Sequence, residues 1–121
     1  MLPARLRFPK SARLSRASEF ARFKREGTSF HGRLMVLSVL KTEPESETRI
    51  GLVTSRRVGG AVVRNRVRRR LREAVRAERP RIERGYWLVL VARQPAARAS
   101  FEAIRKEWLQ LAQRSAILPC S

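Results

Sequence analysis

Hydrophobic residues recur every three or four positions in three segments of the chain, which is the spacing of an amphipathic helix. The pattern predicts a short helix over residues 19–26, a long helix over about 61–79, and a last helix that follows Ser100. Gly27 and Pro80 end the first two helices, because glycine favours a helix C-cap and proline cannot continue a helix. The predicted buried stripe of the long helix consists of Val63, Val67, Leu71 and Ala74.

Three other segments have the pattern of β-strands. Residues 33–41 are rich in Val, Leu and Met, residues 49–54 alternate large and small side chains, and residues 86–92 are almost uninterruptedly apolar. The last of these is predicted to be an interior strand, since an interior strand is covered on both faces. Ser18 and Ser100 are expected to be helix N-caps, because a serine hydroxyl can accept from a free helix N–H.

The order helix, two strands, helix, strand, helix predicts an α+β fold in which helices pack on a small sheet. The chain of 121 residues is 43% hydrophobic, so residues 1–121 are expected to form one domain. Within that domain, residues 1–14 are predicted to be an extended basic arm and residues 115–121 a short tail.

The net charge of the chain indicates which class of molecule it binds. The chain has 28 Lys and Arg against 10 acids, a formal net charge of +18, which is self-repelling in a compact fold unless a polyanion lies against it. Nucleic acid is the most common such partner. The longest apolar runs, residues 34–40 and 87–91, are far too short to span a bilayer, and no signal-peptide pattern is seen, so the cytoplasm is the expected compartment.

The predicted long helix carries most of this charge. Residues 64–72 include six arginines, and no acid stands between Arg49 and Glu73. The helical projection places Asn65 on an outward surface, with three guanidinium groups around it and two more nearer the sheet. An ordinary solvated helix face is the alternative reading, but it lacks the acidic partners that such a face normally has. The surrounding residues are Arg68, Arg69 and Arg72, and the flanking ones are Arg64 and Arg66.

Few residues are suited to catalysis or to metal binding. His31 is the one histidine and the chain has no aspartate, so a two-histidine nuclease pair or a Ser-His-Asp arrangement cannot be assembled. We expect His31 to be a satisfied structural residue. Glu43, Glu45 and Glu47 alternate with Pro44 and Ser46 in a predicted loop, and we expect a solubilising loop tip there, not a metal site. No catalytic and no metal-binding residues are therefore predicted.

Three motifs together resemble a known family. They are RIGLV at residues 49–53, SRRVG at 55–59 and AVVRNRVRRRLRE at 61–73. This combination closely resembles the protein subunit of bacterial ribonuclease P, and the likeness covers most of the chain.

The resemblance implies a two-layer α+β sandwich with a mixed sheet, three helices and a left-handed β-α-β crossover, an exception to the right-handed rule. It also implies an accessory subunit of an endonuclease that removes the 5′ leader of precursor tRNA. The large RNA subunit and the Mg²⁺ ions that it holds would then carry out catalysis. The expected partners are the catalytic RNA and precursor tRNA, with no membrane and no protein partner required.

Two RNA-binding surfaces follow from the resemblance. The catalytic RNA would lie against Arg64, Asn65, Arg66, Arg68, Arg69 and Arg72. The single-stranded leader would lie in a cleft between Phe20 and the sheet, near Lys24, Ser38, Arg56 and Arg57. The chain departs from the family at Lys24, where an aromatic residue is frequent, and at Ser38, where some members have Tyr. Phe23 is expected in the core, because its spacing from Phe20 fits simple packing.

Three other functions stay open at the level of sequence. A structural RNA-binding protein associated with the ribosome would share the charge and the fold class. A free-standing nuclease would cut RNA without an RNA subunit, and a DNA-binding module would place its arginine-rich helix in a major groove.

Overall fold

The computed structural model describes residues 17–115 and residue 117, with the backbone alone for residues 17–20. The predicted arm and most of the predicted tail lie outside these residues. In chain order the elements are α1 (Ala17–Glu26), β1 (Thr28–His31), β2 (Met35–Lys41), β3 (Arg49–Val53), α2 (Ala61–Glu78), β4 (Tyr86–Ala92) and α3 (Phe101–Arg114). Short 3₁₀ helices, η3 (Arg79–Arg81) and η4 (Gln94–Arg98), follow α2 and β4.

The four strands form one mixed sheet in the order β1-β2-β4-β3. Strand β4 is interior, as its apolar run predicts, and it pairs antiparallel with β2 and parallel with β3. The edge strand β1 was not predicted, because its residues TSFH are mostly polar and three of the four are exposed. The predicted strand 33–41 begins two residues too early, since Gly32 to Leu34 form the turn between β1 and β2.

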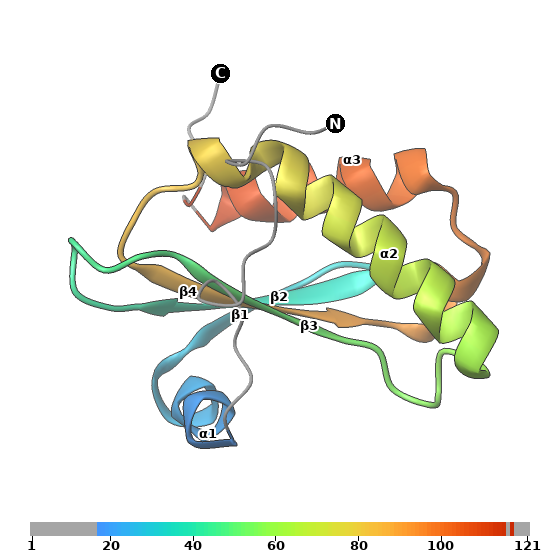
Figure 1. Ribbon diagram of the computed structural model, residues 1–121, viewed down its shortest axis with the longest axis horizontal. Coiled ribbons are helices and arrows are strands. Elements are labelled where there is room, and N and C mark those ends of the chain that lie inside the picture. The colour runs from blue at the N-terminus through green and yellow to red at the C-terminus, as the bar shows by residue number, and fades with distance from the viewer. Residues whose placement is uncertain (1–16, 116, 118–121) are drawn as a thin grey trace.

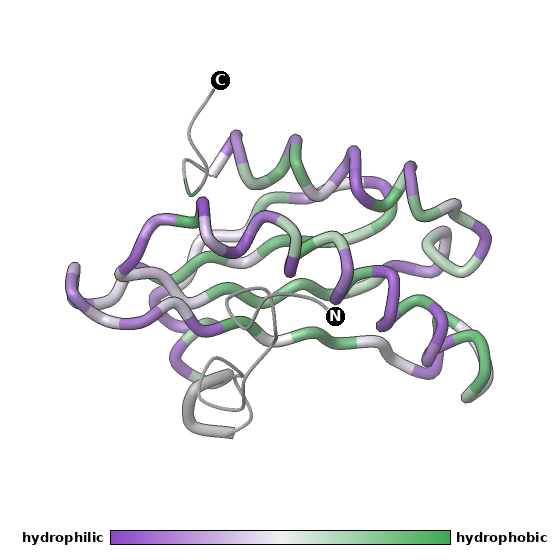
Figure 2. Tube along the Cα trace, turned by 45° about the horizontal axis from the view of Figure 1, so that its top comes forward, coloured by the Kyte–Doolittle hydropathy of each residue, from purple (hydrophilic) through white to green (hydrophobic). Residues whose placement is uncertain are grey.

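Helices α2 and α3 lie on one face of the sheet and α1 lies on the other (Figure 1). The main core fills the space between the sheet and helices α2 and α3, where Leu37, Leu90, Leu71 and Trp108 are completely buried. Hydrophobic residues fill the strands, and hydrophilic residues follow the outer turns of α2 and α3 (Figure 2). Among the described residues, no helix is both long and apolar enough to cross a membrane.

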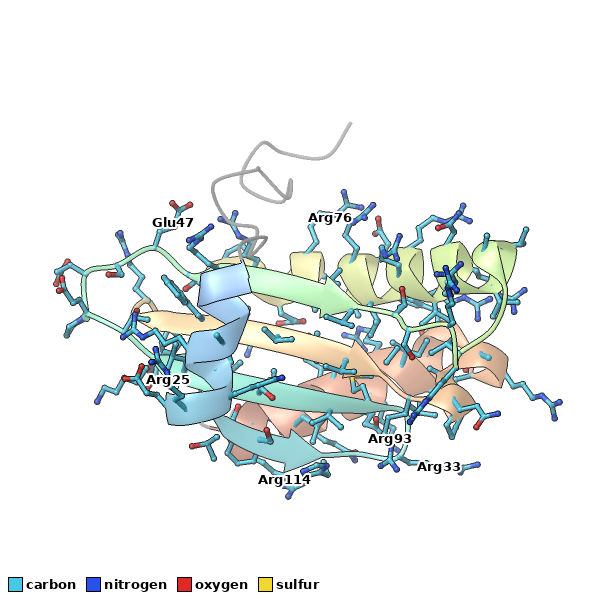
Figure 3. The ribbon with its side chains drawn as sticks, turned by 90° about the horizontal axis from the view of Figure 1, so that it is seen from below. Arg25, Arg33, Glu47, Arg76, Arg93 and Arg114 are labelled. Carbon is cyan, nitrogen blue, oxygen red and sulfur yellow. The ribbon has the colours of Figure 1, made fainter. Side chains whose placement is uncertain are left out.

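The connection from β3 through α2 to β4 has the unusual hand. Seen from the face opposite α2, both strands run from left to right, α2 lies behind them, and β4 lies below β3 (Figure 3). That path is left-handed, whereas most such crossovers are right-handed. The fold expected from the resemblance is therefore confirmed, including its handedness.

The buried side of α2 is wider than predicted. Val67, Leu71 and Ala74 are buried as expected, whereas Val63 is only partly buried at the start of the helix. Val75 and Glu78 are buried too, and α2 packs against both α3 and β3.

The two predicted caps have opposite outcomes. Ser100 caps α3, and its hydroxyl accepts a hydrogen bond from the Ala103 N–H at 3.1 Å. The prediction for Ser18 is wrong, because α1 begins at Ala17 and Ser18 lies inside it. Beyond α3, Ile117 is completely buried and its carbonyl accepts from the Glu83 N–H at 3.0 Å, so this part of the predicted tail belongs to the core.

Candidate nucleic-acid interface

Helix α2 presents a basic surface at its N-terminal half. Asn65, Arg66 and Arg69 are exposed, and the first turn of the helix contains no acid. Val62 is 79% exposed on the same turn, the one large hydrophobic side chain so exposed among the described residues. The predicted buried stripe begins at Val63, and the sequence pattern assigned no role to Val62.

Three arginines of α2 reach back to the protein. Arg68 donates to the Thr54 hydroxyl at 2.9 Å, Arg66 to the Ala97 carbonyl at 3.1 Å, and Arg70 to the Ala99 carbonyl at 2.6 Å. These hydrogen bonds link α2 to the residue after β3 on one side and to the segment around η4 on the other.

The predicted outward surface around Asn65 is only partly correct. Arg69 is exposed as expected, but Arg68 and Arg72 are half-buried. Arg64 is half-buried too, and its buried Nε–H has no hydrogen-bond partner among the described residues. The helical projection fails at Arg68 because an arginine side chain is long enough to bend from the outer surface to a neighbouring residue, here the Thr54 hydroxyl.

The turn between β3 and α2 holds Arg56 and Arg57 in solvent. The turn is closed by hydrogen bonds from the Val58 N–H to the Ser55 carbonyl and from the Gly59 N–H to the Arg56 carbonyl, and Val58 is buried beneath it. Gly59 has a φ of 154°, and a Cβ at this position would approach Cγ1 of Val63 to 2.9 Å. The backbone of the turn is thus held while its two arginines stay accessible.

The sheet face beside α1 is the second region of interest. Phe23 is buried against Leu40 and Val89, which confirms its place in the core and fixes α1 on the sheet. Lys24, the next residue, is exposed on α1. Phe20 lies in α1, and its side chain is outside the described part of the structure.

Next to α1 the sheet is only partly covered. Ser38 is half-buried on β2 and hydrogen-bonds with the Ser29 hydroxyl of β1 at 2.9 Å. One row closer to the Arg56 turn, Val36, Val91 and Val53 stand opposite one another on β2, β4 and β3, and all three are half-buried. We call this row the valine strip. Along β2, buried residues alternate with the half-buried Val36 and Ser38. This alternation in the sequence could have predicted a second, partly covered face of the sheet, but it was not used.

A cation-aromatic cluster stabilises the other end of this face. The Arg22 and Arg49 guanidinium carbons lie 5.4 Å and 5.3 Å from the ring centroid of Trp87. Arg49 is the β3 residue opposite Trp87 on β4, and Arg22 comes from α1. The cluster therefore links α1 to two strands of the sheet.

The described residues contain no group of three or more His, Cys, Asp or Glu side chains that would hold a metal ion. His31 is exposed on the edge strand β1, in contrast to the satisfied structural residue that we expected. Glu43, Glu45 and Glu47 are exposed, and Glu47 forms an ion pair with Arg79 at 3.3 Å.

Comparison with known proteins identifies the family. The family model described as Ribonuclease P matches residues 8–116. The chain belongs to the ribonuclease P protein family. The ribonuclease P protein component of Symbiobacterium thermophilum is 40% identical over 109 residues, 90% of this chain and 95% of the relative. That of Bacillus cereus is 34% identical over 88% of this chain and 92% of the relative.

Solved structures of ribonuclease P proteins have the same fold. The protein from Thermotoga maritima superimposes with a TM-score of 0.75 at 28% identity, over 84% of this chain and 96% of that one. The protein from Staphylococcus aureus reaches a TM-score of 0.83 over 91% of this chain and 100% of that one, at 24% identity. As a ribonuclease P protein, the chain is an RNA-binding subunit in tRNA processing, and the ribosome-associated alternative is not favoured.

Proposed function

We propose that the protein binds the catalytic RNA of ribonuclease P through α2 and the 5′ leader of precursor tRNA through the sheet face beside α1. The observation that carries the proposal is the basic, acid-free N-terminal half of α2. The catalytic-RNA surface comprises Arg64, Asn65, Arg66, Arg68, Arg69 and Arg72, with Val62 added. The leader surface comprises Phe20, Lys24, Ser38, Arg56 and Arg57, with the valine strip added.

The α2 surface suits a folded RNA. Guanidinium groups bind phosphate oxygens in a bidentate manner and stack on bases, and an Asn side chain hydrogen-bonds with phosphate or 2′-hydroxyl oxygens. Arg66 and Arg68 are held by protein acceptors, so less side-chain entropy is lost when they meet a phosphate. Val62, exposed beside them, offers an apolar contact to a ribose or a base edge.

The sheet face suits a single strand. Half-buried valines provide an apolar floor, and exposed Lys24, Arg56 and Arg57 lie on the two sides of it. Proteins bind single strands with such a combination of basic groups along the backbone and apolar or aromatic contacts to the bases. Because precursor and product differ chiefly by the leader, contact with the leader favours binding of the substrate over the product.

In this proposal the protein binds and orients RNA, and the catalytic RNA supplies the reaction. Mg²⁺ ions held mainly by that RNA would generate the attacking hydroxide and stabilise the departing oxygen. The protein's positive charge would replace part of the ionic screening that two RNA molecules need when they approach each other.

The test is cleavage of a 5′-labelled precursor tRNA at low Mg²⁺ by the protein, by a bacterial ribonuclease P RNA, and by the two mixed. We expect cleavage at the mature 5′ end in the mixture alone. Cleavage by the protein without RNA would assign catalysis to the protein, and a mixture no more active than the RNA would contradict the accessory role.

A further inference from the structure

A third basic region lies beside α3, next to the α2 surface and on the face of the sheet opposite the proposed leader surface. It is an open groove of about 630 Å³ between α3, η4 and the turn that joins β1 to β2. Three exposed cations line it, Arg33 from the turn, Arg98 from η4 and Lys106 from α3. We call it the α3 groove. Arg33 precedes Arg98 by 65 residues, and the fold brings it beside Arg98 and Lys106.

The single carboxylate in the α3 groove is already engaged. Glu107 accepts hydrogen bonds from the backbone N–H groups of Arg33, Leu34 and Met35 at 2.8–2.9 Å. Glu102 stands one helical turn before Lys106, and no ion pair among the described residues joins these two side chains. The α3 groove therefore holds three exposed cations against one carboxylate, and its net positive charge favours an anion.

The α3 groove lies at the end of the sheet where Arg33 and Arg93 are found (Figure 3). Arg93, which follows β4, donates to the Gly32 carbonyl at 2.8 Å and lies near Arg33 at this end (Figure 3). The loop that carries Glu47 lies at the opposite end. A polyanion that approaches the molecule is therefore drawn toward the end at which α2 begins.

The α3 groove is physically continuous with α2. Arg70 of α2 donates to the carbonyl of Ala99, which itself lines the groove, and Arg66 donates to the carbonyl of Ala97 within η4. Both α2 and α3 lie on the face of the sheet opposite α1 (Figure 1). A partner bound along α2 can thus continue over η4 into the groove, whereas a leader bound beside α1 lies on the other face.

From this arrangement we infer that the α3 groove binds a second stretch of the phosphate backbone of the catalytic RNA that α2 binds. The inference rests on the proposed function, since it extends the same interface. An open groove with three cations and one carboxylate suits phosphates spaced along a strand better than a protein partner, whose surface mixes both signs of charge.

The test measures binding of the full protein to ribonuclease P RNA over a range of KCl concentrations. The variant combines Arg33→Ala with Lys106→Ala. We expect its dissociation constant to rise by on the order of tenfold at about 0.15 M salt, and the slope of log K against log salt to fall by about one per lost phosphate contact. The charge-preserving pair Arg33→Lys with Lys106→Arg should keep the wild-type slope.

The matched control is Lys41→Ala with Arg84→Ala. It removes the same charge at the opposite end of the sheet, near the loop that carries Glu47, and both residues are exposed. An unchanged affinity for the groove variant, or a loss equal to that of the control, would overturn the inference. A loss seen only when the assembled complex binds precursor tRNA would assign the groove to the substrate and also overturn it. Failure of the wild-type protein to bind the RNA would instead refute the proposed function.

Discussion

Two neighbouring arginines of α2 illustrate how position alone separates binding from structure. Arg69 is exposed, while Arg70 is half-buried and donates to the Ala99 carbonyl at 2.6 Å. Their side chains are chemically identical, but one is available to a phosphate and the other holds η4 against the helix. The density of arginine in this segment is therefore shared between the RNA interface and the fold.

Single substitutions should separate these roles. For Arg69→Ala we expect a salt slope for RNA binding lower by about one, and a free energy of unfolding within about 0.5 kcal/mol of wild type. For Arg70→Ala we expect a loss of about 1 kcal/mol of unfolding free energy, from the lost hydrogen bond, with a slope near the wild-type value. Salt-dependent binding and urea unfolding measure the two effects. Equal free energies of unfolding for the two variants would show that the hydrogen bond of Arg70 does not stabilise the fold.

At the scale of elements, α3 holds the β1–β2 hairpin through one carboxylate. The N–H groups of residues 33–35 all donate to Glu107, and Gly32 lies so close that a Cβ there would meet the carboxylate at 2.6 Å. The turn thus depends on a helix more than seventy residues later for its hydrogen bonds. This contact also sets the position of Arg33 relative to α3.

Glu107→Ala should lower the free energy of unfolding by about 2 kcal/mol or more, because three backbone donors lose their acceptor. Glu107→Gln keeps the shape and one acceptor oxygen, so its loss should be smaller. Urea unfolding with constant m-values measures both variants. Two variants as stable as wild type would mean that water replaces the carboxylate at no cost.

At the scale of the whole molecule, charge is large and unevenly placed. The net charge is +18, and the acidic loop 42–48 lies at the end of the sheet opposite Arg33, Arg93 and the start of α2. Such a distribution steers and orients a polyanion before contact. It also leaves the folded chain under self-repulsion when RNA is absent.

Salt should therefore stabilise the free protein. Raising KCl from about 0.1 M to about 1 M shortens the Debye length from about 10 Å to about 3 Å and screens that repulsion. The ion pairs Arg22–Glu26 and Arg79–Glu47 involve exposed carboxylates and contribute little that salt can weaken. We expect the thermal midpoint to rise by several degrees. A midpoint that falls with salt would show that attractive pairs outweigh the net charge.

The pattern of the sequence determined the elements whose signals are local. The bounds of β4, the length of α2 and the Ser100 cap of α3 follow from apolar runs, helical periodicity and a serine hydroxyl, all within a few residues of one another. The motifs at residues 49–73 also indicated the family and its left-handed crossover. Periodicity alone does not determine the hand, because β3 and β4 carry apolar residues on both faces of the sheet.

Only the tertiary structure decided features whose partners are distant in the chain. Strand β1 is too short and polar to be recognised without β2 beside it. The acceptors of Arg66 and Arg70 lie about thirty residues later in the chain, so no projection of α2 shows that these side chains bind the backbone around η4. The α3 groove combines cations from three elements. A sequence specifies which side chains carry charge, but their separation and their competing acceptors exist only once the chain has folded.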